Sequence, residues 1–220
     1  MKLRTILHPL YVLYQVVFAW WAALLVIALT CICISLFGRY LKVKNGDYYP
    51  ALILFRVVCW ICLVPVKVVD REKYVEKDKN YVFVANHQGF FDVLVMYGYV
   101  QKNFKWMMKA SLRKVPLLGK ACADTDHIYV DRATPQKDIL RKALNILKSG
   151  KSMAIFPEGT RCRRGKMGHF KKGAFVIANM TQKPILPITI DGSYDILPKG
   201  CKCLHWSPVT LTFHAPIECN

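Results

Sequence analysis

The chain has 220 residues, which is enough for one folded domain and a membrane anchor. Lys and Arg total 32 against 14 Asp and Glu, and a net charge of +18 attracts nucleic acid or an anionic membrane surface. A long apolar N-terminal stretch and the lack of a helix-turn-helix or zinc-finger pattern argue against nucleic acid as a partner.

The N-terminal segment, residues 1–64, is predicted to be a membrane-embedded helical hairpin. Residues 11–37 carry no charge, and as a helix they would be about 40 Å long, more than the roughly 30 Å hydrocarbon core. A basic linker, 38–47, leads to a second apolar run, 48–63, which is short for a crossing and contains Arg56. We therefore expect a hairpin embedded from the cytoplasmic side; the alternative is a two-span anchor with the linker outside.

Residues 65–220 are predicted to form an α/β domain with a mixed sheet flanked by helices. Short apolar runs predict strands near 63–69, 81–85, 127–130, 152–156, 185–190 and 208–213. Longer patterns predict helices near 91–100, 105–114, 135–149 and 170–180. Open α/β sheets bind ligands at the carboxyl ends of their strands, so the polar segments after the strands are the candidate site.

The first such segment is 86–92, Asn-His-Gln-Gly-Phe-Phe-Asp, directly after the strand-like run 81–85. An unperturbed histidine has a pKa of about 6.5, and an aspartate bonded to its far nitrogen fixes the tautomer. Positions five apart on a helix lie about 140° apart, so His87 and Asp92 can meet only across a non-helical turn, which Gly89 allows. Alone, the segment also fits a capping Asn, a chance His and a helix-start Asp.

No protein nucleophile accompanies this pair. The chain has no Gly-x-Ser-x-Gly elbow, and the nearest approach, Asp191-Gly192-Ser193-Tyr194-Asp195, lacks the second glycine. Cys162 has no adjacent histidine in sequence. A His–Asp pair without a nucleophile indicates that the substrate supplies the attacking hydroxyl.

The second polar segment is 156–161, Phe-Pro-Glu-Gly-Thr-Arg, after the strand-like run 152–155. Arg161 has the geometry to hold a phosphate with two hydrogen bonds. Alone, the segment fits an ordinary strand-to-loop turn with solvated charges better than a phosphate site.

Together, His-x4-Asp and Phe-Pro-Glu-Gly-Thr-Arg resemble the glycerolipid acyltransferase family, most closely the 1-acyl-sn-glycerol-3-phosphate (lysophosphatidate) acyltransferases. Two further segments resemble family blocks in the right order: 128–132, Ile-Tyr-Val-Asp-Arg, and 186–188, Leu-Pro-Ile. Residues 109–112 resemble the start of the family's lysine-bearing helix. Gly89 stands where many members have serine, so a hydroxyl contact there is absent or replaced.

The resemblance implies a transfer of a fatty acyl group from an acyl thioester to the sn-2 hydroxyl of 1-acylglycerol 3-phosphate, giving phosphatidic acid for phospholipid synthesis. His87 would be the general base and Asp92 its orienter. Glu158 would position the phosphate array or a glycerol hydroxyl. The implied substrate-binding residues are Lys109, Arg132, Glu158, Gly159, Thr160 and Arg161.

The implied donor is acyl-CoA or acyl carrier protein, the other partners are membrane lipids, and no cofactor or metal is required. Cys201, Cys203 and His205 alternate but are too few for a zinc site. Two alternatives stay open: an acyltransferase for glycerol 3-phosphate, a lysophospholipid or a lyso-aminolipid, and a non-catalytic lipid-binding membrane protein. Scattered cysteines of odd number fit a reducing environment, which favours a catalytic domain on the cytoplasmic face of the membrane.

Overall fold

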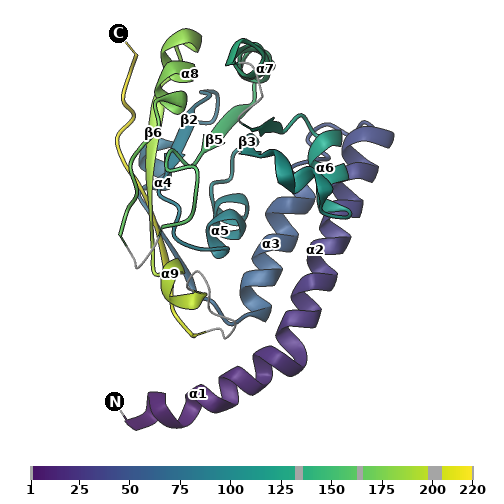
Figure 1. Ribbon diagram of the computed structural model, residues 1–220, viewed down its shortest axis with the longest axis vertical. Helices are drawn as coiled ribbons and strands as arrows, with labels where there is room; N and C mark the ends of the chain where they lie inside the picture. Colours follow the sequence, from purple (N-terminus) through teal and green to yellow (C-terminus); the bar gives the residue numbers. More distant parts are fainter. Residues whose placement is uncertain (1, 132–135, 163–165, 198–204, 220) are drawn as a thin grey trace.

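The computed structural model (Figure 1) describes residues 2–131, 136–162, 166–197 and 205–219. It begins with one continuous helical stretch that comprises α1 (Lys2–Tyr14), a π-helical turn (Gln15–Ala19), α2 (Trp20–Ile34) and a second π-helical turn (Ser35–Tyr40). Helix α3 (Tyr49–Ile61) follows. The first helical stretch is longer than the predicted 11–37, because the polar residues on both sides of the uncharged run are helical as well.

Helix α3 lies between α2 and the rest of the molecule (Figure 1). It packs on α2 with one side and on α5 (Phe91–Tyr99) with the other. Arg56, in the middle of α3, donates from Nε to the Gly98 carbonyl at 2.5 Å and lies over the Tyr99 ring at 5.1 Å. Its charge is therefore satisfied by the α/β domain, and the two predicted parts of the chain share one hydrophobic core.

The described residues form a seven-stranded mixed sheet in the order β1-β7-β6-β2-β5-β3-β4. The pairs β6–β2–β5–β3–β4 are all parallel, and the antiparallel pair β6–β7 reverses the direction for β7 and its parallel neighbour β1. The predicted α/β class with a mixed sheet is confirmed. The strands are β1 (Val66–Val69), β2 (Val82–Ala85), β3 (Phe104–Lys109), β4 (Ile128–Val130), β5 (Ser152–Ile155), β6 (Ile185–Asp191) and β7 (Val209–Phe213).

Helices cover both faces of the sheet, and the alternation of side chains along each strand divides the core in two. Phe83 and Ala154 face α5 and α3, while Val82 and Met153 face α7 (Gln136–Lys148) and α8 (Gly173–Thr181). The remaining helices are short: α4 (Arg71–Tyr74), a 3₁₀ turn (Ala110–Lys114), α6 (Leu118–Asp124) and α9 (Ser193–Ile196). None of these four was predicted as a separate element.

The predicted helix over 105–114 is wrong, because residues 104–109 form β3 between β5 and the edge strand β4. Lys105, inside this strand, is only 2% exposed and forms an ion pair with Asp47 in the linker between α2 and α3. The resemblance implied that Lys109 lies on a helix. It lies instead at the end of a strand.

The parallel direction of β2, β3, β4, β5 and β6 brings their carboxyl ends to one edge of the sheet. Residues 86–92 follow β2, residues 156–162 follow β5, and residues 192–193 follow β6. Polar segments that are far apart in the sequence therefore meet at this edge. Open α/β sheets bind their ligands at the carboxyl ends of the strands.

Candidate active site

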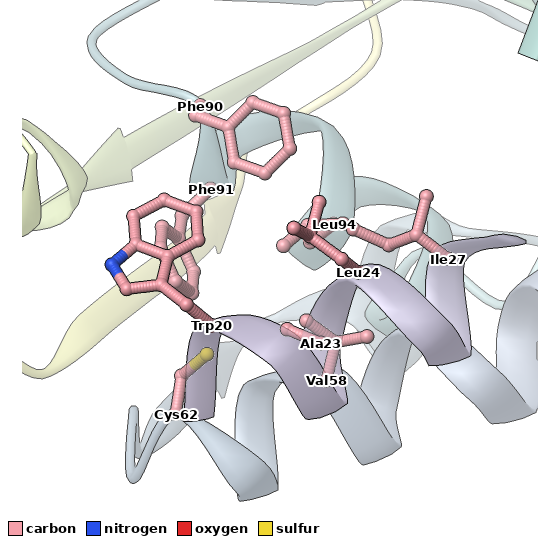
Figure 2. A pocket seen from close by; sticks show the side chains of 9 residues that line it. All are labelled: Trp20, Ala23, Leu24, Ile27, Val58, Cys62, Phe90, Phe91 and Leu94. Atoms are coloured by element: carbon pink, nitrogen blue, oxygen red, sulfur yellow. The ribbon is translucent and has the colours of Figure 1, made fainter. Parts of the chain in front are cut away.

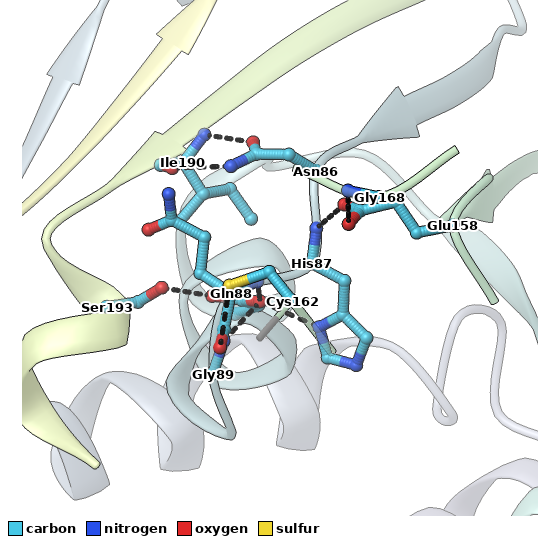
Figure 3. A network of polar contacts seen from close by, with 10 residues as sticks. Asn86, His87, Gln88, Gly89, Glu158, Cys162, Gly168, Ile190 and Ser193 are labelled. Atoms are coloured by element: carbon cyan, nitrogen blue, oxygen red, sulfur yellow. Dashed lines mark hydrogen bonds and ion pairs between the residues drawn. The ribbon is translucent and has the colours of Figure 1, made fainter. Parts of the chain in front are cut away.

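His87 and Asp92 form the centre of the candidate site. Figure 3 shows His87 with the polar groups around it. His87 lies in the non-helical loop between β2 and α5, and Asp92 lies in the first turn of α5. The His87 Nδ1 and Asp92 Oδ2 atoms are 2.7 Å apart. The predicted pairing across a non-helical turn is present. Because Nδ1 faces the carboxylate, Nε2 is the ring nitrogen available to a substrate.

The Asp92 carboxylate is fully buried and completely hydrogen-bonded. Oδ2 accepts the backbone N–H of Gln88 at 2.5 Å and that of Gly89 at 2.9 Å, in addition to His87. Oδ1 accepts the hydroxyl of Ser193. A buried charge needs this number of donors, and they hold the carboxylate in one orientation toward the imidazole.

The loop after β5 holds the backbone of His87 on both sides. The His87 N–H donates to Glu158 Oε1 at 2.8 Å, and its carbonyl accepts the Cys162 N–H at 2.7 Å. The imidazole stacks on the Phe156 ring with centroids 4.0 Å apart and planes 7° apart. The segment Phe-Pro-Glu-Gly-Thr-Arg therefore positions the histidine directly.

Glu158 joins two loops and is buried with 6% exposure. Its second oxygen, Oε2, accepts the Gly168 N–H at 2.7 Å, so both oxygens receive backbone donors. The sequence predicted a role toward the acceptor; the structure shows a role toward the backbone of His87. A direct contact of Glu158 with substrate stays a prediction.

Asn86 fixes the other side of the loop to the sheet. Its side-chain amide donates to the Ile190 carbonyl at 2.8 Å, and its side-chain oxygen accepts the Ile190 N–H at 2.8 Å (Figure 3). Together with the Ser193 contact, this pair joins the His87 loop to the end of β6. Sequence reasoning assigned neither Asn86 nor Ser193 a function, and the partner atoms lie about a hundred positions away.

Two of the three predicted phosphate-binding cations lie at the carboxyl edge. Lys109 ends β3 and is exposed, and Arg161 follows β5 and is partly exposed. Neither side chain has an ion pair or a hydrogen bond within the part of the chain that the structure describes. Arg132 lies outside the described residues. The exposed Gly159 and Thr160 lie between Glu158 and Arg161.

The backbone conformation at position 159 favours glycine. Its φ of +69° is in the left-handed region, and a Cβ there would come within 2.8 Å of the Lys171 Nζ. Lys171 is also anchored through its N–H to the Pro157 carbonyl at 2.9 Å. A further cation thus lies against the Glu-Gly-Thr-Arg turn.

An apolar cavity lies beside the site, between α2, α3 and the start of α5 (Figure 2). It has a volume of about 30 Å³, and its walls include Trp20, Leu24, Val58, Phe90 and Phe91. The two phenylalanines belong to the segment that carries His87 and Asp92. Helices α2 and α3 therefore lie directly against the segment that carries His87 and Asp92.

The other histidine, cysteine and acidic side chains that the structure describes form no second candidate site. Within the described ranges, no cluster of three or more His, Cys, Asp or Glu side chains is placed to hold a metal ion. His127 is partly buried against Tyr97, and desolvation there lowers the pKa of its imidazole to about 3. Cys201 and Cys203 lie outside the described residues, and His205 contacts His8, with His8 Nε2 and His205 Nδ1 2.9 Å apart.

Comparison with known proteins gives one consistent result. The family model "Acyltransferase" matches residues 66–191. A chloroplastic 1-acyl-sn-glycerol-3-phosphate acyltransferase of Arabidopsis thaliana is 35% identical over 150 residues, covering 67% of this chain and 42% of that protein. A 1-acyl-sn-glycerol-3-phosphate acyltransferase of Helicobacter pylori is 32% identical over 176 residues, covering 78% of this chain and 72% of that protein.

A solved structure is similar over nearly the whole chain. The 1-acyl-sn-glycerophosphate (LPA) acyltransferase PlsC from Thermotoga maritima matches with a TM-score of 0.75 and 28% identity, covering 96% of this chain and 85% of that one. In contrast, the chain spans less than half the length of the Arabidopsis thaliana and Brassica napus relatives, 42% and 43%.

Proposed function

The chain belongs to the acyltransferase family, and we propose that it transfers a fatty acyl group from an acyl thioester to the sn-2 hydroxyl of 1-acylglycerol 3-phosphate, giving phosphatidic acid. The observation that carries this proposal is the His87–Asp92 pair at 2.7 Å, held at the carboxyl edge by two other loops. The names of the relatives support the acceptor.

The chemistry follows from the free ring nitrogen of His87. Nε2 takes the proton of the acceptor hydroxyl while the oxygen attacks the thioester carbonyl. The C–S bond then breaks, the thiol leaves with the proton that His87 held, and the ester remains on the acceptor. Asp92 stabilises the imidazolium that forms between these steps. Ser193 is an unsuitable nucleophile, because its hydroxyl is fully buried and donates to Asp92.

The acceptor phosphate would bind Lys109 and Arg161, whose charges are available at the edge where His87 lies. An unpaired guanidinium binds two phosphate oxygens at once and so orients the glycerol as well as holding it. Arg132 remains the third proposed cation, on the residues that follow β4. The donor is acyl-CoA or acyl carrier protein, and the proposal assigns no metal or other cofactor to the reaction.

We place the protein on a membrane through its N-terminal helices. Among the described residues, one helical stretch, His8–Tyr40, is long and apolar enough to cross a bilayer by length and composition. Its outward face carries an apolar stripe at helical spacing, exposed by 42–69%: Trp21, Leu25, Leu29, Ile32 and Leu36. This stripe is the surface that we propose to lie in lipid.

The packing supports embedding from one side over a two-span anchor. Helix α3 is held between α2 and α5, and the linker contacts the sheet through Asp47–Lys105 and Asn45–Asn103. A linker on the far side of the bilayer would break all of these contacts. We therefore propose that the linker and the catalytic domain share the cytoplasmic side.

The activity is tested with purified protein in detergent, labelled acyl-CoA or acyl carrier protein, and a panel of acceptors. We expect labelled phosphatidic acid from 1-acylglycerol 3-phosphate, and loss of at least a hundredfold in kcat for His87→Ala with an unchanged melting temperature. Labelling of another acceptor in preference would replace the assignment. Near-normal turnover by folded His87→Ala would refute the mechanism.

The membrane arrangement is tested by thiol labelling in sealed cells with an impermeant reagent. Lys44 is exposed in the linker, and Lys148 is exposed at the end of α7. In a cysteine-free background, Lys44→Cys and the control Lys148→Cys should both label only after permeabilisation. Labelling of Lys44→Cys in intact cells, with Lys148→Cys protected, would establish the two-span anchor instead.

A further inference from the structure

Ser193 lies at the beginning of α9, directly after β6, and is fully buried. Gly192 precedes it with a φ of +85°, and a Cβ on Gly192 would come within 2.0 Å of the Pro208 carbonyl oxygen. The turn that presents Ser193 is therefore fixed by packing on the residues before β7. From this turn the Ser193 hydroxyl donates to Asp92 Oδ1.

The two oxygens of Asp92 have unequal surroundings. Oδ2 accepts three N–H groups, from His87, Gln88 and Gly89. Among the described residues, Ser193 is the donor to Oδ1. A carboxylate turns about its Cβ–Cγ bond, and donors on one oxygen alone leave the other buried and unpaired. The Ser193 hydroxyl therefore fixes the plane in which Oδ2 faces the imidazole.

Gly89 packs closely against the backbone of Ser193. A Cβ on Gly89 would lie 2.6 Å from the Ser193 carbonyl oxygen, closer than carbon and oxygen atoms approach without a shift. A side chain at position 89 would thus push α9 away from Asp92. The expected hydroxyl contact is replaced, because the β6–α9 turn supplies the hydroxyl and occupies the space next to Gly89.

We propose that Ser193 is a positioning residue for the acyl transfer, and that it acts by orienting Asp92 toward His87. This inference rests on the proposed function for its catalytic consequence. It gives the Asp-Gly-Ser-Tyr-Asp segment a role without nucleophilic chemistry: the glycine forms the turn and the serine completes the donors on Asp92.

The test compares Ser193→Ala with Ser152→Ala. Ser152 is also fully buried, and its hydroxyl accepts the Tyr81 N–H, away from Asp92. A hydrogen bond to a charged group typically changes an equilibrium by about ten- to a hundredfold. We expect that loss in kcat for Ser193→Ala with both KM values unchanged, near-normal kcat for Ser152→Ala, and partial recovery in Ser193→Thr, which keeps the hydroxyl.

A second pair of variants approaches the same contact without removing the hydroxyl. Gly89→Ala places a methyl group against Ser193, whereas a Cβ on Gly173 meets no atom within 4 Å. We expect a lower kcat for Gly89→Ala and no change for Gly173→Ala. This pair decides the question if Ser193→Ala does not fold. Wild-type kcat in both folded Ser193→Ala and folded Gly89→Ala would overturn the proposal.

Nitrogen NMR of the His87 ring gives a readout that does not need activity. With Asp92 fixed, the Nδ1–H tautomer dominates; Ser193→Ala should mix the tautomers, and Ser152→Ala should not. If the wild-type protein shows no acyl transfer but the tautomer shift occurs, the proposed function fails and the positioning role stands. An unchanged tautomer in Ser193→Ala refutes the positioning role whatever the activity.

Discussion

Asp92→Asn separates the charge of the aspartate from its geometry. The backbone N–H groups of Gln88 and Gly89 both point at the position of Oδ2. An amide in that place must therefore turn its oxygen toward them and toward His87, while its NH₂ group faces the Ser193 hydroxyl, which can rotate to accept. The variant should keep the fold and the hydrogen bond to His87 and lose only the negative charge.

The size of that loss follows from the separation of the charges. The ring nitrogen and the carboxylate oxygen are 2.7 Å apart, which puts the two charge centres about 4 Å apart. At an effective dielectric constant of about 20, unit charges at that distance interact by about 4 kcal/mol. Removing this stabilisation from the imidazolium should lower kcat by about a thousandfold.

Asp92→Ala is the comparison that tests the geometric half of the argument. It leaves several buried donors without an acceptor, and each unsatisfied group costs about 1–3 kcal/mol. Asp92→Ala should therefore lower the free energy of unfolding by several kcal/mol, because this penalty applies to each donor left without an acceptor. Asp92→Asn should lower it by much less. Acyl transfer measured with labelled acyl-CoA and unfolding measured in denaturant give the two quantities. Asp92→Asn with kcat within tenfold of wild type would show that no imidazolium forms next to this residue.

Two further perturbations test separate parts of the structure. Arg161→Ala should reduce kcat/KM for the phosphorylated acceptor by about ten- to a hundredfold and leave donor KM unchanged, since a charged hydrogen bond contributes about 1.5–3 kcal/mol; equal acceptor kinetics would remove Arg161 from the site. Burial lowers the pKa of His127 to about 3, so between pH 3 and 6.5 the unfolded state binds more protons and stability falls as pH falls. From pH 7 to pH 5 the free energy of unfolding should decrease by about 2 kcal/mol more in the wild type than in His127→Gln; equal pH dependence would contradict a neutral, partly buried His127.

The strands could be predicted from the sequence where burial on both faces makes the apolar run continuous. Residues 82–85 and 152–155 are buried at every position, and both were expected as strands to within one residue at each end. The strand at residues 104–109 could not be predicted, because the partner of Lys105 is Asp47, which is distant in the sequence. A lysine inside a strand looks like a solvent-facing residue until the tertiary structure supplies its counter-ion.

The candidate site could likewise be predicted only in part. His87 and Asp92 lie only five positions apart, so their spacing is enough to predict the pair, and Glu158 could be located by its motif. The task of Glu158 could not be predicted, because it depends on the backbone N–H of His87 and not on a side chain. Ser193 was noticed only as an incomplete nucleophile elbow, since nothing near it in the sequence indicates a buried carboxylate as its partner.

The position of the histidine is thus determined by residues at the ends of three strands and not by its own loop alone. The segment after β2 carries His87, and the segment after β5 binds both its backbone N–H and its backbone carbonyl. Ile190 at the end of β6 binds Asn86, and Ser193 directly after β6 binds Asp92. Each contact uses a backbone atom or a buried polar atom, and these vary little in position compared with surface side chains. General-base catalysis needs the hydroxyl proton within hydrogen-bond reach of Nε2. A histidine fixed from both neighbouring strands meets that requirement before substrate binds, so the binding energy of the phosphate and the acyl chain is left to orient the substrates.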